Sequence, residues 1–285
     1  MHGKLIALCL LMVFAPSLWA EEVWLTLPGK QQVVADYQAG PPEAPALLIL
    51  HGFLVTGAFP TIQTLANEFS AKGYTVLTPT LSLGITGRRA GLACDAIHTH
   101  SLAQDLAEIS LWVDWLASHG KGPIYLIGHS FGGVQLLAYA ASSPHPRVRG
   151  LVGMSLSYTG AEGEEIRTDE LARAEAMRGA GDGSLGRYNL MYCHGNYTSN
   201  PESYLSYATL DRSRVLELLG RNRIPTIAIM GGEDRRYGAD WVEAMRALNV
   251  STRVIPGASH FFDGSHEFDL LDMFDSALTD LRAGS

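Results

Sequence analysis

The stretch Tyr125–Gln135, YLIGHSFGGVQ, contains an apolar run that ends abruptly at a serine flanked by glycines. Residues Gly128 to Gly132 match the pattern G-x-S-x-G, in which a serine occupies a sharp turn between a strand and a helix. The residues two before and two after the serine must lack bulk, and the serine hydroxyl is exposed beyond the end of the strand. An apolar strand pattern precedes the match and an Ala/Leu-rich helix pattern follows it. Ser130 is therefore a candidate nucleophile, and the alternative is a plain glycine turn.

The segments on both sides of this turn alternate between strand and helix patterns. Strands are expected at Val23–Leu27, Gln32–Tyr37, Ala46–Leu50, Tyr74–Leu77, Ile124–Ile127, Gly150–Ser155, Pro225–Met230 and Thr252–Ile255. Helices are expected at Thr61–Lys72, Ser101–His119, Val134–Ala141, Asp240–Leu248 and Glu267–Leu281. Alternating strands and helices indicate a mostly parallel sheet covered by helices on both faces, which is the doubly wound α/β class.

One segment interrupts this alternation. Residues 157–222 are too many for a simple connection and show no clear strand. We expect them to form a cap inserted between two strands of a core that comprises residues 21–156 and 223–285. The second part of the segment is rich in tyrosine, and these side chains either line a pocket or pack the cap onto the core. They are Tyr188, Tyr192, Tyr197, Tyr204 and Tyr207.

A serine hydroxyl is a poor nucleophile unless a base removes its proton. His260, in VIPGASHFFDG, lies in the loop directly after the last expected strand and is the candidate base. Asp234, in IAIMGGEDRRYG, follows the preceding strand and could orient that histidine. Glu233 and Asp263 are the rival carboxylates. The alternative role for Asp234 is a solvated acid paired with a neighbouring arginine.

Acyl transfer also needs two N–H groups that bind the oxyanion. The N–H of Phe131 follows the candidate nucleophile at a helix N-terminus, whose partial positive charge favours an anion. The second N–H is expected from the loop after the strand that ends in LILHGF. Phe53 is the candidate there and Leu54 the fallback, while a plain turn at His51-Gly52 is the alternative.

The segments HGF, GHSFGG, GGEDRR and GASH occur in this order along the chain. In this order of oxyanion loop, nucleophile, acid and base, the chain resembles the serine hydrolases of the α/β-hydrolase superfamily over about residues 23–284. The resemblance implies an eight-stranded, mostly parallel sheet with a cap after the sixth strand. It also implies Ser130 as nucleophile, Asp234 as acid and His260 as base. Serine instead of aspartate at the turn argues against the epoxide-hydrolase and dehalogenase branches.

The first 20 residues have the form of a secretory signal peptide. Lys4 precedes an apolar run from Leu5 to Ala15 that is too short to span a bilayer, and Ala20 ends the segment before two glutamates. The alternative is a retained membrane anchor. The signal peptide predicts a secreted or periplasmic protein, and no other stretch is long and apolar enough for a transmembrane helix once it is removed.

Removal of this segment leaves two cysteines, Cys94 and Cys193. Disulfides persist in exported proteins, so we expect a bridge between them, with two separate buried thiols as the alternative. Cys94, His98 and His100 also suggest zinc, but closed zinc sites usually need four ligands in recognisable pairs. The pair Arg88 and Arg89 is expected to be solvated, and contact with an anionic substrate is the alternative.

The charge balance bears on the partners of the protein. With 29 acidic and 21 basic residues, the chain has a net charge of −8, which argues against a nucleic-acid partner. We expect a secreted or periplasmic serine carboxylesterase that cleaves small or medium esters through an acyl-enzyme on Ser130, without cofactor or metal. A non-catalytic binding protein on the same scaffold is the alternative outside enzymes. Peptidase, thioesterase, lipase and lactonase activities are the alternatives within this fold.

Overall fold

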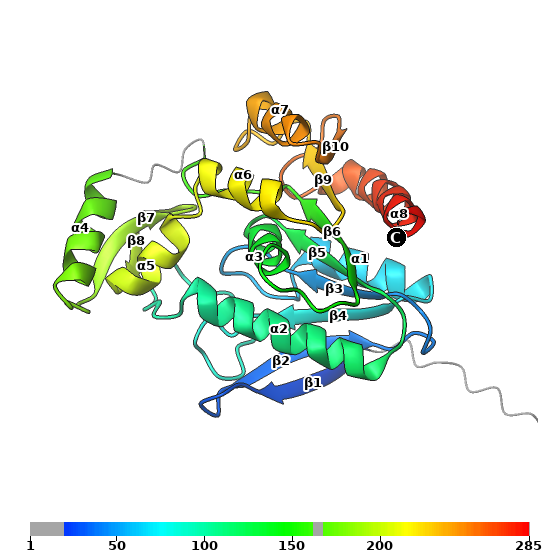
Figure 1. Ribbon diagram of the computed structural model, residues 1–285, viewed down its shortest axis with the longest axis horizontal. Helices are drawn as coiled ribbons and strands as arrows, with labels where there is room; N and C mark the ends of the chain where they lie inside the picture. The colour runs from blue at the N-terminus through cyan, green and yellow to red at the C-terminus, as the bar shows by residue number, and fades with distance from the viewer. Residues whose placement is uncertain (1–19, 162–167, 285) are drawn as a thin grey trace, which may run out of the picture.

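The computed structural model describes residues 20–161 and 168–284, so the expected signal peptide lies outside the described residues except for Ala20. The main sheet has eight strands in the order β1-β2-β4-β3-β5-β6-β9-β10 (Figure 1). They are β1 (Glu21–Thr26), β2 (Gln32–Gln38), β3 (Ala46–Leu50), β4 (Thr75–Thr80), β5 (Ile124–His129), β6 (Val148–Met154), β9 (Thr226–Gly231) and β10 (Ser251–Ile255). Strand β2 runs antiparallel to its two neighbours, and all other pairs are parallel. The predicted fold class is confirmed, and every expected strand overlaps an observed one.

Helices cover both faces of this sheet (Figure 1). They are α1 (Pro60–Ala71), α2 (Leu102–His119), α3 (Phe131–Ala140), α6 (Arg212–Arg221), α7 (Ala239–Ala247) and α8 (Glu267–Ala283), with the short 3₁₀ helix η1 (Gly264–His266) before α8. Helices α1 and α8 share one apolar layer, and α2, α3, α6 and α7 contribute to the other. The sheet is therefore doubly wound.

Strand β3 shows why the centre of the sheet has this form. All five of its residues, ALLIL, are buried. Leu47 and Ile49 pack in the layer of α1 and α8, while Leu48 and Leu50 pack in the layer of α2 and α3. A strand covered on both faces needs a continuous apolar run, so this sequence fits a central parallel strand.

The inserted segment differs from the expectation that it contains no clear strand. Between β6 and β9 the chain forms α4 (Thr168–Gly179), β7 (Gly186–Leu190), β8 (Cys193–Ser199) and α5 (Pro201–Ala208) before α6. Strands β7 and β8 form an antiparallel hairpin at one end of the molecule (Figure 1). Tyr188, Leu190, Cys193 and Tyr197 are buried, while Arg187, His194 and Asn196 are exposed. The alternation is too short and too polar to be recognised without its packing partners.

Helix α6 also lies in the segment expected as cap, yet it packs on the core. Its buried residues Val215, Leu218 and Leu219 join the apolar layer of α2 and α3. The side chain of Asp211 accepts a hydrogen bond from the N–H of Arg214 and so begins this helix. The part of the insertion that stands off the sheet is therefore α4, the hairpin and α5.

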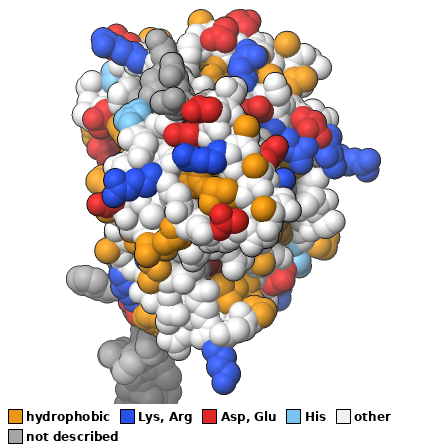
Figure 2. Space-filling model, turned by 90° about the vertical axis from the view of Figure 1, so that its left-hand side faces the viewer, with side chains coloured by type: hydrophobic (Ala, Val, Ile, Leu, Met, Phe, Trp, Pro, Cys, Tyr) orange, Lys and Arg blue, Asp and Glu red, His pale blue; other side chains and the backbone are white. Residues whose placement is uncertain are grey.

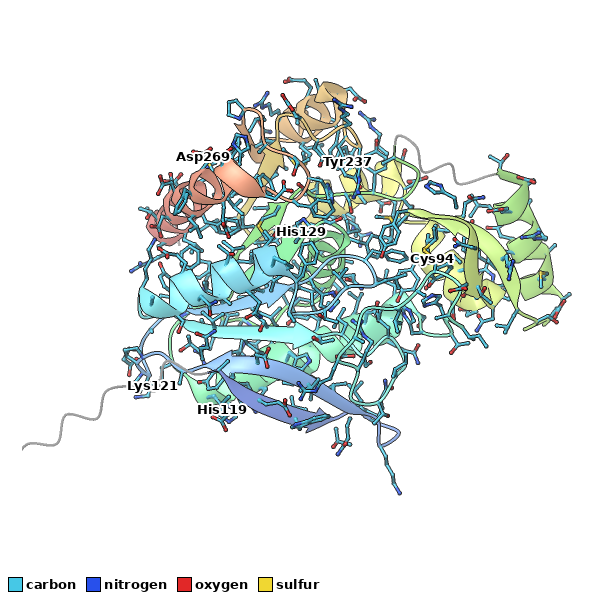
Figure 3. The ribbon with its side chains drawn as sticks, turned by 180° about the vertical axis from the view of Figure 1, so that it is seen from behind. Cys94, His119, Lys121, His129, Tyr237 and Asp269 are labelled. Carbon is cyan, nitrogen blue, oxygen red and sulfur yellow. A yellow bond between two sulfur atoms is a disulfide. The ribbon has the colours of Figure 1, made fainter. Side chains whose placement is uncertain are left out.

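The predicted bridge between Cys94 and Cys193 is present, with Cα atoms 5.5 Å apart. It joins the loop before α2 to the first residue of β8, beside the turn of the hairpin (Figure 3). The N–H of His98 donates to the carbonyl of Thr198, and the hydroxyl of Ser199 donates to the carbonyl of His98. Covalent and hydrogen bonds therefore fasten the hairpin to the core.

Replacement of both cysteines by serine is expected to lower the free energy of unfolding by about 4–5 kcal/mol. The bridged residues are 99 positions apart, and closing a loop of about 100 residues restricts the unfolded chain by roughly this amount. Urea unfolding of the oxidised protein and of the double variant measures the difference. Wild-type protein in excess reductant is the control and should unfold like the variant, whereas equal stability of all three samples would contradict the prediction.

Within residues 20–161 and 168–284, no helix combines the length and the apolar character that a membrane crossing requires.

Figure 2 shows the end of the molecule that carries the hairpin. Acidic, basic and apolar side chains are interspersed on this face. The visible face therefore has no large patch of a single charge.

Candidate active site

Ser130 lies in the sharp turn between β5 and α3, with φ 54° and ψ −126°. This left-handed backbone is costly for a residue other than glycine and is tolerated where the surrounding structure enforces it. A Cβ atom on Gly128 would lie 2.4 Å from the Cα of Gly133, and one on Gly132 would lie 2.1 Å from the carbonyl oxygen of His51. The two outer glycines of the motif are therefore required by close backbone contact.

His260 lies in the loop after β10, and its Nδ1 is 2.6 Å from Oδ2 of Asp234, in the loop after β9. Since a carboxylate only accepts, Nδ1–H of the histidine donates, and Nε2 is left with its lone pair. Both side chains are almost fully buried. The rival carboxylates Glu233 and Asp263 are exposed, and Asp263 instead accepts from the hydroxyl of Ser259.

Ser130 and His260 line one cavity of about 220 Å³. In the part of the chain that the structure describes, no hydrogen bond joins their side chains. Such contacts are often long in hydrolases without substrate and tighten when substrate binds. The structure thus brings a histidine–aspartate pair and a serine on a strained turn to the same cavity.

The backbone of His260 is held by two side chains from neighbouring strands. Its carbonyl oxygen accepts one hydrogen bond from the hydroxyl of Ser155 and one from Nε2–H of His129, each 3.0 Å long. His129 ends β5 and lies deep in the molecule (Figure 3), while Ser155 directly follows β6. These two contacts fix the loop that carries the imidazole of His260 relative to the strand that carries Ser130. In the G-x-S-x-G pattern His129 is only a variable position, so the sequence carried no signal for this role.

Two buried histidines beside the site are held in the neutral form. Burial and the neighbouring His260 lower the pKa of His129 to about 3. Burial and the positive charge of Arg88 lower the pKa of His51 to about 3. Nε2 of His51 accepts a hydrogen bond from the N–H of Leu81, and its Nδ1–H donates to the carbonyl of Gly52. Both rings therefore act as uncharged supports of the site.

Acidification is expected to destabilise the protein through these two rings. An unfolded histidine binds a proton near pH 6.5, whereas the folded rings resist protonation down to about pH 3. The stabilising contribution is therefore complete above about pH 6.5 and is lost as the pH falls towards 3, by about 1.4 kcal/mol per pH unit for each ring. In His129→Gln the amide can still donate to the carbonyl of His260, but it does not titrate. The free energy of unfolding of this variant should therefore fall less steeply with decreasing pH, by the contribution of one ring.

Urea unfolding at several values between about pH 4 and pH 6 measures this slope. The control is His119→Gln at an exposed position (Figure 3), which should retain the wild-type slope. An unchanged slope for the His129 variant would show that this ring is protonated in the folded state.

The two N–H groups expected to bind an oxyanion lie at the start of α3 and in the loop after β3. Phe131 is the first residue of α3, so its N–H has no partner within the helix. Phe53 lies in the loop after β3, and its ring packs edge-on against that of Phe131, with centroids 5.9 Å apart. Among the described residues, neither N–H donates to a protein group. The fallback residue Leu54 has φ 56° in the same loop.

Arg88 holds this loop and is not the solvated residue that the sequence suggested. Its side chain is 3% exposed. The guanidinium donates to the carbonyls of Leu54 and Val55 in the loop after β3, and also to those of Leu81 and Ala90. Because a guanidinium has five N–H donors, one arginine can satisfy several backbone carbonyls in loops that lack the regular hydrogen bonds of a sheet. Arg89 is the exposed member of the pair and forms an ion pair with Glu22.

Residues from the core and from the cap form the wall of the 220 Å³ cavity. The core contributes Phe53, Phe59 and Phe261, and the tip of the hairpin contributes Met191 and Tyr192. The hydroxyl of Tyr192 donates to the carbonyl of Phe53 at 3.1 Å. The cap therefore contacts the loop after β3 directly.

The cap tyrosines divide between the two roles that the sequence left open. Tyr192 lines the cavity, and the other four are buried. Tyr188 and Tyr204 stack with centroids 4.0 Å apart, and Tyr197 stacks on His98 at 4.4 Å. The hydroxyl of Tyr207 donates to Asp105. Packing is thus the main role of this group.

The candidate zinc ligands are all engaged elsewhere. Cys94 is bonded to Cys193, which removes its thiolate. His98 lies against Tyr197, and Nδ1 of His100 is 2.6 Å from the hydroxyl of Tyr207. Within the described ranges, no group of three histidine, cysteine or acidic residues could hold a metal ion.

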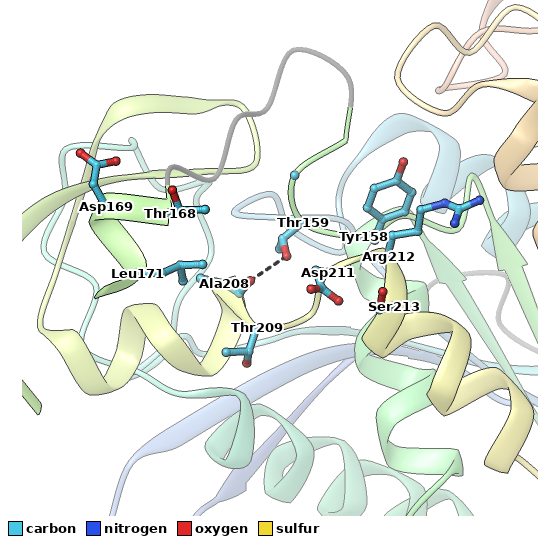
Figure 4. Close-up of a pocket in the computed structure, with 11 residues that line it drawn as sticks. Tyr158, Thr159, Thr168, Asp169, Leu171, Ala208, Thr209, Asp211, Arg212 and Ser213 are labelled. Carbon is cyan, nitrogen blue, oxygen red and sulfur yellow. Dashed lines mark hydrogen bonds between the residues drawn. The ribbon is translucent and has the colours of Figure 1, made fainter. Parts of the chain in front are cut away.

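A second, larger cavity of about 820 Å³ lies away from Ser130, between α4, α5 and α6 (Figure 4). Its wall includes Thr159, whose hydroxyl donates to the carbonyl of Ala208. Among the described residues that line this cavity, none belongs to the His260–Asp234 pair. The smaller cavity at Ser130 is therefore the candidate active site.

Comparison with known proteins agrees with this geometry. A family model described as "Alpha/beta hydrolase family" matches residues 47–271, which include all three residues of the candidate triad. A comparison with curated proteins finds no match.

Several solved structures are similar to the chain. Est1E from Butyrivibrio proteoclasticus has a TM-score of 0.64 and 16% identity, over 93% of this chain and 99% of that chain. The alpha/beta hydrolase GrgF from Penicillium sp. sh18 has a TM-score of 0.68 and 15% identity, over 93% and 98%. The thioesterase domain from the curacin biosynthetic pathway has a TM-score of 0.60 and 20% identity, over 91% and 99%. At these identities the similarity shows the fold and no particular substrate.

Proposed function

Because this chain belongs to the alpha/beta hydrolase family, we propose that it is a serine carboxylesterase that cleaves small or medium esters through an acyl-enzyme on Ser130. The observation that carries the proposal is the hydrogen bond from Nδ1–H of His260 to Asp234 at the cavity that also contains Ser130. This bond presents Nε2 as a base to a serine that the strained turn exposes.

In the first half of the proposed reaction, Oγ of Ser130 attacks the ester carbonyl carbon while Nε2 of His260 takes the hydroxyl proton. The carbonyl oxygen becomes an oxyanion, and the N–H groups of Phe53 and Phe131 donate to it. Asp234 stabilises the imidazolium. When the tetrahedral intermediate collapses, the bond to the leaving oxygen breaks and that oxygen takes the proton from His260, which releases the alcohol.

The second half repeats these steps with water. His260 removes a proton from a water molecule as its oxygen attacks the acyl carbon, and the oxyanion forms again in the same hole. Collapse breaks the bond to Oγ of Ser130, which recovers the proton. The net reaction is ester plus water to acid plus alcohol, and every proton transfer uses a residue of this chain.

A fluorophosphonate probe tests the proposed nucleophile. Oγ of an activated serine displaces fluoride from phosphorus and becomes covalently labelled. We expect one label, mapped to Ser130 by mass spectrometry, and no label after denaturation. Absence of labelling would favour the non-catalytic binding protein on the same scaffold.

A panel of substrates separates the carboxylesterase from its relatives of the same fold. Ethyl esters of rising acyl length, with matched thioesters and amides, distinguish esterase, lipase, thioesterase and peptidase. The cavity of about 220 Å³ favours short acyl groups, since a drug-sized ligand usually occupies at least about 300 Å³. A maximum of kcat/KM at a long acyl chain would contradict the proposal.

We further propose that the protein is exported. The disulfide between Cys94 and Cys193 supports this location, because such bridges persist in oxidising compartments. N-terminal sequencing of the protein recovered from the cell envelope or medium tests it. A mature chain that begins after Ala20 is expected, and an intact N-terminus in the cytosol would contradict export.

A further inference from the structure

The cavity at Ser130 has one permanently charged group in its wall. Among the described residues that line it, Arg236 alone carries a full charge, and no carboxylate lines it. His129, on the same wall, is neutral near pH 7 because burial lowers its pKa to about 3.

A hydrogen bond of its backbone and a contact of its side chain hold Arg236 in place. It follows Asp234 by two residues, and its N–H donates to Oδ1 of that aspartate at 3.1 Å. The guanidinium carbon lies 5.3 Å from the centre of the Phe261 ring, a cation–π arrangement that holds the charge on the cavity side of the loop. The residue that orients His260 therefore also anchors this arginine.

The guanidinium has no acidic partner within the described ranges. The structure shows ion pairs for Arg89, Arg212, Arg214, Arg221, Arg246 and Arg253, but none for Arg236. Its five N–H donors are suited to bidentate contact with a carboxylate. An unpaired guanidinium that faces a partly closed, aromatic cavity is thus a ready site for an anion.

Resting on the proposed esterase function, we propose that the cavity selects esters that carry a second, ionised carboxyl group, and that Arg236 binds this carboxylate. The aromatic rings of Phe53, Phe59 and Phe261 contact the short apolar segment between the carboxylate and the scissile carbonyl. At about 30 Å³ per water-sized group, the cavity holds roughly seven non-hydrogen atoms, which is enough for the acyl part of a succinate half-ester but not for its alcohol part as well. The substrates are therefore half-esters of short dicarboxylic acids.

Two pairs of ethyl esters test this selectivity. Monoethyl succinate is compared with ethyl 4-oxopentanoate, and monoethyl glutarate with ethyl 5-oxohexanoate. Within each pair a methyl ketone replaces the carboxylate, so length and shape are conserved and the charge is removed. Acid release is followed by chromatography at constant ionic strength, and the measured quantity is the ratio of kcat/KM for the charged ester to that for the neutral ester.

Three variants locate the effect. Arg236→Gln should lower this ratio by about ten- to a hundred-fold, the usual range for a charge-assisted hydrogen bond. Arg236→Lys keeps the positive charge but lacks the paired N–H donors of the planar guanidinium, so it should give an intermediate ratio. Arg235→Gln removes the same charge from the exposed neighbour and should leave the ratio unchanged. Equal ratios in wild type and Arg236→Gln would overturn the proposal, and so would an equal decrease in both arginine-to-glutamine variants.

Fluorophosphonate labelling separates this inference from the proposed function. Succinate should protect Ser130 from labelling in the wild type and in Arg235→Gln, but not in Arg236→Gln. Labelling without any protection by succinate would refute the carboxylate site and leave the nucleophile intact. A protein that is not labelled at all would instead refute the proposed function.

Discussion

Ser130→Ala is expected to abolish ester hydrolysis while the protein remains folded. Removal of the nucleophile from a triad lowers kcat by about a million-fold in well-studied hydrolases. Alanine keeps the Cβ atom that the turn already accommodates at φ 54°, so the backbone is no more strained than before. The hydroxyl of Ser130 makes no hydrogen bond to any described residue, so its loss should leave stability nearly unchanged.

Initial rates on ethyl butyrate, together with thermal unfolding, measure the two parts of this prediction. The control is Ser142→Ala, which removes a hydroxyl just beyond the other end of α3 and should retain wild-type rates. If Ser130→Ala kept more than about one per cent of kcat, another group would have to act as the nucleophile.

Asp234→Asn is expected to lower kcat by about 10⁴-fold with little change in fold. The amide can present its NH₂ group to Nδ1 of His260, which then accepts and carries its own proton on Nε2. In that tautomer the imidazole no longer offers a base to Ser130. The side chain of Asp234 is buried, so water cannot easily take over its role.

The neighbouring carboxylates make matched controls for this variant. Glu233→Gln and Asp263→Asn change the same functional group at exposed positions in the two loops. Each is expected to change kcat by less than about three-fold, since neither contacts His260 in the structure. If kcat of either control fell by as much as in Asp234→Asn, that carboxylate would have to be assigned as the acid instead.

The core of the fold was predictable because its elements have strong local patterns. Strand β3 is apolar throughout, and GHSFGG satisfies the steric needs of a turn where a Cβ on Gly132 would lie 2.1 Å from a backbone oxygen. These requirements act over a few residues, so they are visible in one sequence. The pairing of His260 with Asp234 was also accessible, because parallel strands bring the loops after β9 and β10 to one edge.

Other features depend on contacts between distant segments and had no local signal. The β7–β8 hairpin is short and polar, and it is fastened by Cys94 and by His98 from a loop about 100 residues earlier. The burial of Arg88 follows from carbonyls of the loop after β3, more than 30 residues away. The orientation of Arg236 depends on Phe261. Sequence patterns record the types of these residues but not their neighbours.

The link between Cys94 and Cys193 also imposes an order of maturation. Its 99-residue span contains Ser130, and Cys193 immediately follows Met191 and Tyr192 in the cavity wall. Newly made chains whose thiols are still reduced would hold that wall only by non-covalent packing. Oxidation after synthesis would then complete the binding surface, so under the proposed export the full proposed activity would develop only after the chain has left the compartment of its translation.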